Sequence, residues 1–253
     1  MNKPIISVQN VSMTFESQRN KEQFMALKNV SFDIAEREFI CILGSSGCGK
    51  TTLLNIMGGF LKPTSGSLLI EGMPVERPVP RYLSIFQDYK LLPWRTVRKN
   101  IELGFEAAKH KLPQSEIDRR VDEQIKSVGL VGFEDYSPTE ISGGMKQRVA
   151  IARALVLEPK ILFMDEPFGA LDTMTRDDLR RYFRTLLKKT GQTVVMVTHN
   201  LNEALSFADK VIIMHPNPGR IVSIVDVDLP ELRDIHSEEL RALRLEVYNA
   251  LIR

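Results

Sequence analysis

The chain's length, composition and charge exclude several classes of protein. It has 253 residues, 43% of them hydrophobic and 26% charged, which is ordinary globular usage and unlike that of a disordered chain. The 34 basic and 32 acidic side chains leave a net charge of +2, too balanced to indicate a nucleic-acid-binding protein or a polycation that binds membrane surfaces. We therefore expect a soluble, globular α/β chain.

Cysteine usage and the N-terminus point to a reducing compartment. Cys41 and Cys48 are the only cysteines, so the sequence contains neither a disulfide framework nor a CxxC metal pair. The first residues lack the pattern of a signal peptide, and no apolar run approaches the roughly 18 residues of a membrane-spanning helix. We expect another chain to supply any membrane-embedded part.

The first third of the chain is predicted to consist mostly of strands. Alternating polar and apolar residues favour antiparallel strands, whereas the apolar run before Gly44 favours a buried parallel strand. The predicted strands are 5–15, 29–34, 38–44, 65–72 and 81–87, with a helix from Lys50 to Phe60.

Helical spacing begins near residue 88. Apolar residues recur at steps of three and four in Ile117, Val121, Ile125 and Val128. Ser115 and Asp118 resemble a capping box at the start of that helix. We predict a helical subdomain over 88–158.

Strands and helices alternate again after Pro159. This alternation predicts a parallel sheet covered by helices, built from 1–87 and 159–230, and followed by an amphipathic helix within 231–253. The predicted strands are 161–165, 194–199, 211–215 and 219–229, and the predicted helices are 175–189, 201–208 and 237–252.

The sharpest motif is GSSGCGKT at 44–51, which fits G-x-x-x-x-G-K-[ST] between a strand and a helix. Glycines let backbone N–H groups converge on phosphates at a helix N-terminus, while Lys50 reaches the β- and γ-phosphates and Thr51 holds Mg²⁺. The structural alternative is an ordinary Gly/Ser-rich turn. The predicted nucleotide-binding residues are Gly44, Ser45, Ser46, Gly47, Cys48, Gly49, Lys50, Thr51 and Thr52.

Two further motifs carry chemistry. In ILFMDEP, Asp165 ends an apolar strand and is a candidate Mg²⁺ ligand, while Glu166 is a candidate general base; the alternative is a turn with two solvated acids. In ISGGM, Ser142, Gly143 and Gly144 precede a helix and predict a second anion-binding end, which two head-to-tail copies would use. The alternative there is an ordinary helix start.

Together these motifs closely resemble an ABC-transporter ATP-binding subunit, from Ile6 to about residue 230. They correspond to the family's Walker A, Walker B and signature motifs, and three short loops match as well. Those are Gln87 at the Q-loop, GALD at 169–172 at the D-loop, and His199 at the H-loop.

The resemblance implies a P-loop NTPase fold with a mostly parallel sheet, an antiparallel β subdomain and a helical subdomain. It implies ATP and Mg²⁺ as cofactors and hydrolysis at a homodimer interface. Gln87 and Asp165 would complete the Mg²⁺ and water shell, His199 would contact the γ-phosphate, and Asp172 would line the interface. Phe15 stands where adenine usually stacks on an aromatic ring; a core phenylalanine is the alternative.

The sequence also departs from the family pattern. Ile141 and Met145 replace the usual Leu and Gln of the signature, whereas the phosphate-contacting Ser142, Gly143 and Gly144 are intact. We therefore expect catalysis to survive.

Segments 86–101, 142–145 and 216–234 resemble the nitrate/sulfonate/taurine branch of importer ATPases. This implies a permease dimer, an extracytoplasmic binding protein, a peripheral position on the cytoplasmic face of the membrane, and a small oxyanion or sulfonate as cargo. Trp94 lies in the loop where permeases dock in such transporters, although a core tryptophan is the alternative.

Other functions remain open at this point. An ABC ATPase acting on ribosomes or DNA usually carries two cassettes or a long coiled coil, and this chain has one cassette and near-neutral charge. A silent ATP-binding regulator is disfavoured because Lys50, Asp165, Glu166 and His199 are all present. An importer of an unrelated small solute is the remaining alternative.

Overall fold

The computed structural model describes residues 3–16, 21–79, 81–86, 88–107, 112–168, 191–228 and 237–252. The chain divides into two compact units. The first unit comprises Met1–Val79, Phe163–Glu166 and Thr193–Arg253, and the second comprises Pro80–Leu162 and Pro167–Gln192. Among the described residues no helix has the length and apolarity that a membrane crossing needs.

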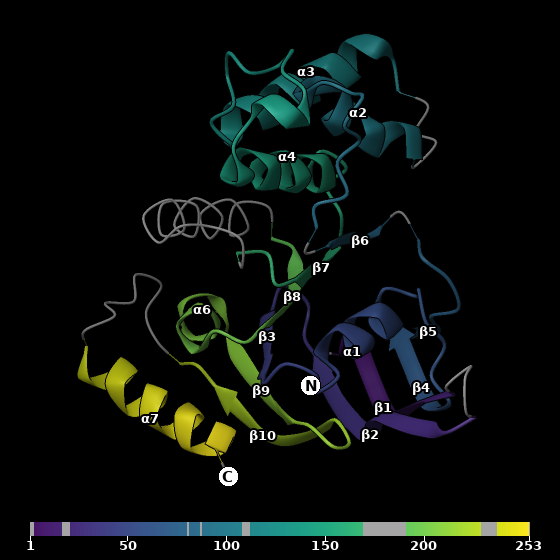
Figure 1. The fold of residues 1–253 in the computed structure, drawn as a ribbon, viewed down its shortest axis with the longest axis vertical. Helices are drawn as coiled ribbons and strands as arrows, with labels where there is room; N and C mark the ends of the chain where they lie inside the picture. Colours follow the sequence, from purple (N-terminus) through teal and green to yellow (C-terminus); the bar gives the residue numbers. More distant parts are fainter. Residues whose placement is uncertain are drawn as a thin grey trace. The chain divides into compact units, whose positions relative to one another are not determined.

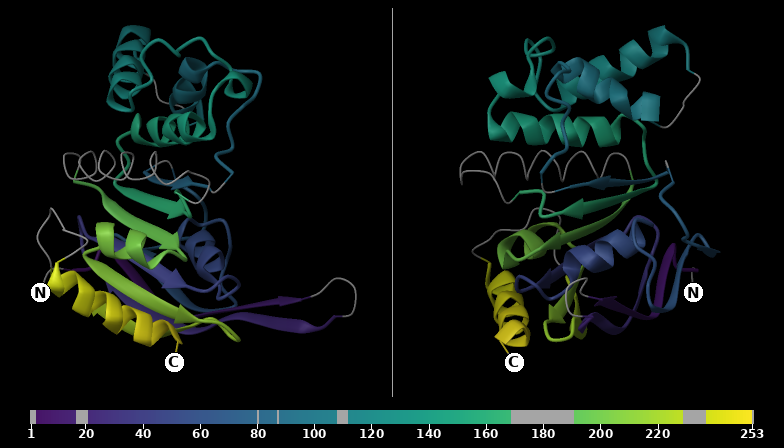
Figure 2. Two further views of the ribbon diagram at one scale, coloured as in Figure 1. Left: turned by 60° about the vertical axis from the view of Figure 1, so that its left-hand side comes forward. Right: turned by 45° about the vertical axis from the view of Figure 1, so that its right-hand side comes forward.

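The first unit contains a four-stranded antiparallel sheet in the order β2-β1-β4-β5. Its strands are β1 (Ile6–Glu16), β2 (Gln23–Ile34), β4 (Ser65–Ile70) and β5 (Met73–Pro74). Figure 2 shows β1 and β2 as a long hairpin. The strand predicted over 29–34 begins earlier, at Gln23, because the exposed start of β2 pairs with the far half of β1, a partner that no local pattern signals.

The second sheet of this unit is mostly parallel, as predicted. Its strands run in the order β10-β9-β3-β8-β7, with β3 parallel to β8 and β9, and β10 antiparallel to β9. They are β3 (Phe39–Gly44), β7 (Ile161–Asp165), β8 (Thr193–Thr198), β9 (Lys210–His215) and β10 (Arg220–Asp226). Nearly every residue of β3, β7 and β8 is buried, which explains their continuous apolar sequences.

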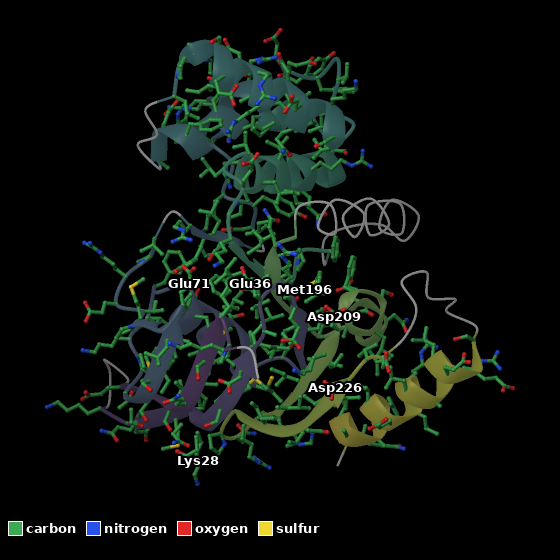
Figure 3. The ribbon with its side chains drawn as sticks, turned by 180° about the vertical axis from the view of Figure 1, so that it is seen from behind. Lys28, Glu36, Glu71, Met196, Asp209 and Asp226 are labelled. Carbon is green, nitrogen blue, oxygen red and sulfur yellow. The ribbon has the colours of Figure 1, made fainter. Side chains whose placement is uncertain are left out.

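Asp209 ties the amino ends of two parallel strands together. Its carboxylate accepts the Phe39 N–H at 2.8 Å, and its own N–H donates to the Phe39 carbonyl at 2.8 Å. Figure 3 labels Asp209 together with Met196 on β8 and Asp226 at the end of β10. The opposite, carboxyl ends of these strands are where open α/β sheets bind ligands.

Three described helices complete the first unit: α1 (Lys50–Met57), α6 (Leu201–Phe207) and α7 (Glu238–Ile252). The helix predicted from Lys50 to Phe60 ends at Met57, because Gly59 adopts a φ of 77°. Helix α7 lies beside α6 and β9 (Figure 1), and buries Leu240 and Val247 of its predicted apolar face. The predicted helix 175–189 lies outside the described residues.

The second unit contains the predicted helical block. Its elements are β6 (Tyr82–Ile85), which lies beside the start of β7, then α2 (Val97–Ala107), α3 (Gln114–Ser127), the 3-10 helix η1 (Pro138–Glu140) and α4 (Gly143–Leu155). Helices α2, α3 and α4 pack around a buried apolar cluster that includes Ile101, Val121 and Val149.

The capping box predicted at Ser115 and Asp118 is wrong. Helix α3 begins one residue before Ser115, and its N-cap is Pro113, which makes no side-chain cap. Proline fixes φ near the helical value, here −57°, so the helix starts without a hydroxyl cap. A capping box does form at η1, between Ser137 and Glu140.

Candidate functional site

The loop at 44–51 turns from β3 into α1 on glycines. Gly47 and Gly49 have φ values of 79° and 92°, which side chains rarely adopt. A Cβ on Gly49 would also lie 2.6 Å from the Leu27 Cδ2 atom and 2.9 Å from the Ala26 carbonyl oxygen. Gly49 caps α1 without any side-chain hydrogen bond, so the first N–H groups of this helix are available to an anion.

Lys50 folds back over this loop. Its Nζ donates to the carbonyl oxygens of Gly44 at 2.8 Å and Ser45 at 3.0 Å, and the residue is only 6% exposed. A buried ammonium held by neutral carbonyls is incompletely compensated, so phosphate oxygens entering the loop would find a strong and prepositioned donor. Burial raises the pKa of the neighbouring Cys48 thiol despite the opposing effect of Lys50.

Thr51 and Asp165 come together from α1 and β7. The Thr51 hydroxyl donates to Asp165 Oδ1 at 3.2 Å, and Asp165 is 8% exposed. Burial is the main cause that raises the pKa of Asp165, and the nearby Glu166 adds to it, whereas the Thr51 hydrogen bond and Lys50 oppose it. A hydroxyl and a carboxylate oxygen are ligands that Mg²⁺ accepts beside phosphate and water, so this pair fits the metal.

Glu166 and His199 meet at the carboxyl ends of β7 and β8. Glu166 has a φ of 44°, and its N–H donates to the Val197 carbonyl at 3.0 Å, which fixes the backbone just beyond the strand. His199 Nδ1 lies 3.0 Å from Glu166 Oε1. The His199 side chain is 55% exposed and that of Glu166 is 19% exposed, so the pair faces an accessible edge.

The sequence did not predict a second row of polar groups next to His199. The Thr198 hydroxyl donates to the buried Glu203 carboxylate at 2.7 Å and accepts the Asn200 N–H at 3.0 Å. Asn200 in turn caps α6 by accepting the N–H groups of Asn202 and Glu203. The sequence signal for this arrangement was an Asn followed three residues later by Glu.

The signature segment lies in the second unit. Ser142 is the N-cap of α4, and its hydroxyl accepts the Met145 N–H at 3.3 Å. Ser142 and Gly143 are exposed, and a Cβ on Gly143 would meet no atom within 4 Å. The structure therefore presents this helix end on an open surface of its unit.

Four further predicted residues fall in three groups. Phe15 is 38% exposed and stands opposite Phe24 in the β1–β2 hairpin, so a ring face is accessible, unlike that of a core residue. Trp94 is 76% exposed, so the alternative of a core tryptophan is wrong. Gln87 and Asp172 lie outside the described residues.

The first unit thus brings five predicted side chains to one edge of its sheet, linked by the contacts above: Lys50, Thr51, Asp165, Glu166 and His199. This arrangement can hold a nucleotide's phosphates, a divalent cation and a polarised water. Lys50 and Thr51 begin helix α1 directly after the phosphate loop, and Asp165, Glu166 and His199 lie at the carboxyl ends of β7 and β8.

Comparison with known proteins agrees with this chemistry. Residues 27–169 match the family model described as ABC transporter. The nitrate import ATP-binding protein NrtD of Synechococcus elongatus is 41% identical over 96% of this chain and 90% of its own length. The nitrate import ATP-binding protein NrtC of the same organism is 47% identical over 83% of this chain, but the matched region is 32% of that relative, so this chain spans about a third of it.

A solved structure matches as well. The ATP-binding cassette MJ0796, in a dimeric post-hydrolysis state bound to ADP and Pi, has a TM-score of 0.78 and 33% identity, covering 89% of this chain and 100% of that one. Fold, phosphate loop and sequence similarity agree: the chain belongs to the ABC transporter family, as an ABC-type ATPase with the P-loop NTPase fold.

Proposed function

We propose that the chain, as a single nucleotide-binding domain made of both units, is the motor subunit of an importer for nitrate or a similar small oxyanion or sulfonate. The cluster of Thr51 with Asp165 and of Glu166 with His199 beside the phosphate loop is the observation that carries hydrolysis. The import function is supported by relatives named for nitrate and bicarbonate transport.

In this mechanism the loop amides and Lys50 bind the phosphates of ATP. Thr51 and Asp165, with Gln87, hold Mg²⁺, which neutralises phosphate charge when bound. Glu166 orients a water molecule toward the γ-phosphate and accepts its proton as the bond to the β-phosphate oxygen breaks. His199 positions Glu166 through its Nδ1 and contacts the γ-phosphate.

Hydrolysis would require two copies. Ser142, Gly143 and Gly144 form an exposed helix end whose N–H groups suit an anion, whereas each phosphate loop already supplies its own helix end. In a head-to-tail homodimer each copy would offer Ser142 to the nucleotide held by the other. The dimeric state of the MJ0796 cassette supports this arrangement.

Coupling to transport would use a permease at the cytoplasmic face of the membrane, with a substrate-binding protein on the other side. We assign permease docking to the Leu91–Trp94 segment, because its Trp94 side chain is 76% exposed and a large exposed aromatic side chain is typical of interface anchors.

Co-purification with the Glu166→Gln variant tests the proposal. Removal of the general base should lower turnover by about 10²-fold or more while ATP binding persists, which traps the ATP-bound assembly. We would tag this variant in its host, solubilise membranes gently with ATP, and identify stoichiometric partners by mass spectrometry.

A multi-spanning permease among the partners supports the motor function, and uptake of nitrate, taurine and sulfonates then identifies the cargo. Recovery with ribosomes or DNA-repair proteins and without an integral-membrane partner would overturn it in favour of a permease-independent ATPase. The wild-type chain without ATP is the control for assembly trapping.

A further inference from the structure

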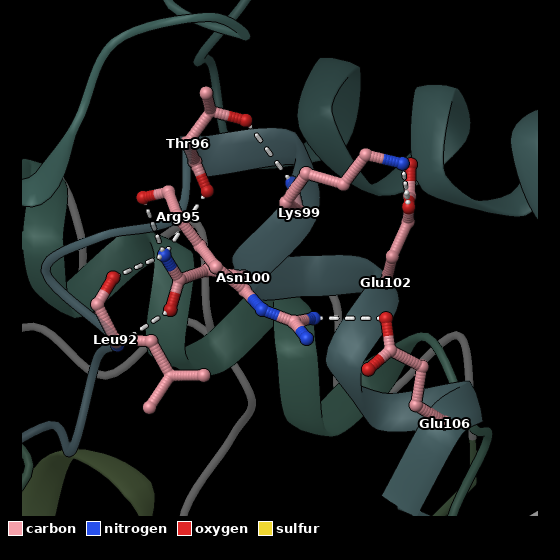
Figure 4. A network of polar contacts seen from close by, with 7 residues as sticks. All are labelled: Leu92, Arg95, Thr96, Lys99, Asn100, Glu102 and Glu106. Carbon is pink, nitrogen blue, oxygen red and sulfur yellow. Dashed lines mark hydrogen bonds and ion pairs between the residues drawn. The ribbon is translucent and has the colours of Figure 1, made fainter.

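Asn100 is a buried polar side chain that holds the backbone next to Trp94. It lies in the first turn of α2 and is 0% exposed. Its Nδ2 donates to the carbonyl oxygens of Leu92 at 3.1 Å, Arg95 at 3.0 Å and Thr96 at 3.0 Å, and its Oδ1 accepts the Leu92 N–H at 2.8 Å (Figure 4).

All four of these hydrogen bonds end on main-chain atoms of residues 92–96. Within the same turn, the Arg95 N–H donates to the Leu92 carbonyl at 3.1 Å, and the Lys99 N–H donates to the Thr96 hydroxyl at 3.3 Å. The Asn100 side chain thus holds the 92–96 turn together and anchors the backbone before and after Trp94 to α2.

Asparagine is the residue type that this arrangement requires. One short side chain must offer two N–H groups and one acceptor oxygen. Aspartate keeps the acceptor but sets a carboxylate against three carbonyl oxygens, and glutamine is longer by one methylene. Since asparagine is a weak helix former, its place in α2 is explained by the turn and not by the helix.

The consequence concerns the exposed indole. Trp94 is 76% exposed, yet the backbone on either side of it is pinned at Leu92 and Arg95. A surface segment whose backbone is already ordered loses less conformational freedom when a partner binds.

We propose that Asn100 is the positioning residue of the permease-docking surface: its amide fixes the 92–96 turn so that Trp94 is presented to the permease. This inference rests on the proposed function, because it takes the Leu91–Trp94 segment as the docking site. The inference extends the docking surface to Asn100, a buried residue that does not itself contact the permease.

The first test uses the isolated full chain and needs no permease. Trp94 is the only tryptophan, so time-resolved fluorescence anisotropy reports on this turn alone. Asn100→Asp and the milder Asn100→Ser should both show a larger fast-depolarising component, and trypsin should cleave after Arg95 at least about fivefold faster, because proteolysis follows local opening. Asn249→Asp, the same chemical change on an exposed residue of α7, should match the wild type.

The second test measures recovery of the host permease with tagged variants at equal folded protein. Asn100→Asp and Trp94→Ala should each lower recovery about tenfold, with unchanged ATP affinity and basal hydrolysis, and the double variant should be no worse than the more affected single one, because both act through one contact.

The outcomes separate the two proposals. Wild-type anisotropy in both Asn100 variants, or normal permease recovery by Asn100→Asp while Trp94→Ala loses it, would overturn the role of Asn100 alone. Normal recovery by Trp94→Ala would overturn the docking surface itself and this inference with it.

Discussion

The two glycine-containing helix starts of this chain are built differently. At α1, Gly49 caps the helix with no side-chain hydrogen bond. The tip of the loop, from Ser45 to Gly47, is exposed, but its two ends are enclosed: a Cβ on Gly44 would lie 2.5 Å from the Met214 carbonyl oxygen and 2.6 Å from the Cys48 sulfur. At α4, Ser142 caps its own helix, and Gly143 faces open space.

Under the proposed function, this difference suits the two helix starts to different tasks. An enclosed helix start with uncapped N–H groups and a buried Lys50 can hold an anion within one chain. An exposed, self-capped start has no enclosure of its own in the described part of the second unit, so it suits a nucleotide brought by another molecule. The Ser142 hydroxyl accepts the Met145 N–H and retains its own hydrogen for donation to a phosphate oxygen.

The largest effect should come from the first helix start. Lys50→Met keeps the aliphatic stem but removes the ammonium, so hydrolysis should fall by about 10²–10³-fold, as on loss of a preorganised donor to the reacting group. Steady-state phosphate release measures this loss, and titration with a fluorescent ATP analogue measures the accompanying loss of affinity. Turnover within threefold of the wild type would remove Lys50 from the site.

A change at the start of α4 should impair dimerisation and leave nucleotide binding by the monomer intact. Ser142→Arg places a large side chain on the open helix end, so ATP-driven dimerisation should weaken at least about tenfold, or ~1.4 kcal/mol, while nucleotide binding by the monomer persists. Analytical ultracentrifugation with ATP in the Glu166→Gln background gives the dimerisation constant. Ser142→Thr, which keeps the hydroxyl, is the matched control, and dimers of Ser142→Arg at wild-type ATP concentration would contradict the head-to-tail arrangement.

The contrast also explains what the sequence could predict. The phosphate loop and the parallel sheet were predictable because their chemistry lies in short continuous segments with fixed spacing and apolar strands. The contact of His199 with Glu166 joins the ends of two strands, so the sequence did not predict it. Family resemblance only placed His199 at the γ-phosphate and Glu166 at the attacking water.

The sequence did not predict the roles of residues that pack against distant segments or hydrogen-bond to their main-chain atoms. Asn100 reads as one polar residue among others in 98–102, and only its burial and its contacts with residues 92–96 reveal its role. Gly219 reads as the end of a turn, yet a Cβ on it would collide with the Cys48 carbonyl oxygen of the phosphate loop. Tertiary contacts between distant segments decide both cases.

Substitution of Gly219 tests whether the packing around the phosphate loop supports nucleotide binding. Gly219→Ala would also bring a Cβ to 2.5 Å from the Ala26 carbonyl oxygen, and such overpacking costs about 1–3 kcal/mol. The melting temperature should fall by about 2–4 °C for each kcal/mol, with a matching loss of ATP affinity. Gly143→Ala, the same change at the open start, should alter neither quantity in the monomer; equal effects of the two substitutions would show that enclosure does not support the loop.

The smallest predicted effect concerns the Asp165 carboxylate, which is buried beside the phosphate loop. Because burial raises the pKa of Asp165, its carboxylate destabilises the nucleotide-free chain at neutral pH. Asp165→Asn should therefore raise the melting temperature by about 2–4 °C, the shift that ~1 kcal/mol gives at this size, while Mg²⁺-dependent hydrolysis is lost. The folded state holds the proton more tightly than the unfolded state, so this gain should be complete above the raised pKa and vanish as the pH falls toward the ordinary value of 3.8. Thermal unfolding of both proteins between pH 4 and 8, without nucleotide, measures it; a lower melting temperature of Asp165→Asn at neutral pH would mean that the Thr51 hydrogen bond and Lys50 outweigh the cost of burial.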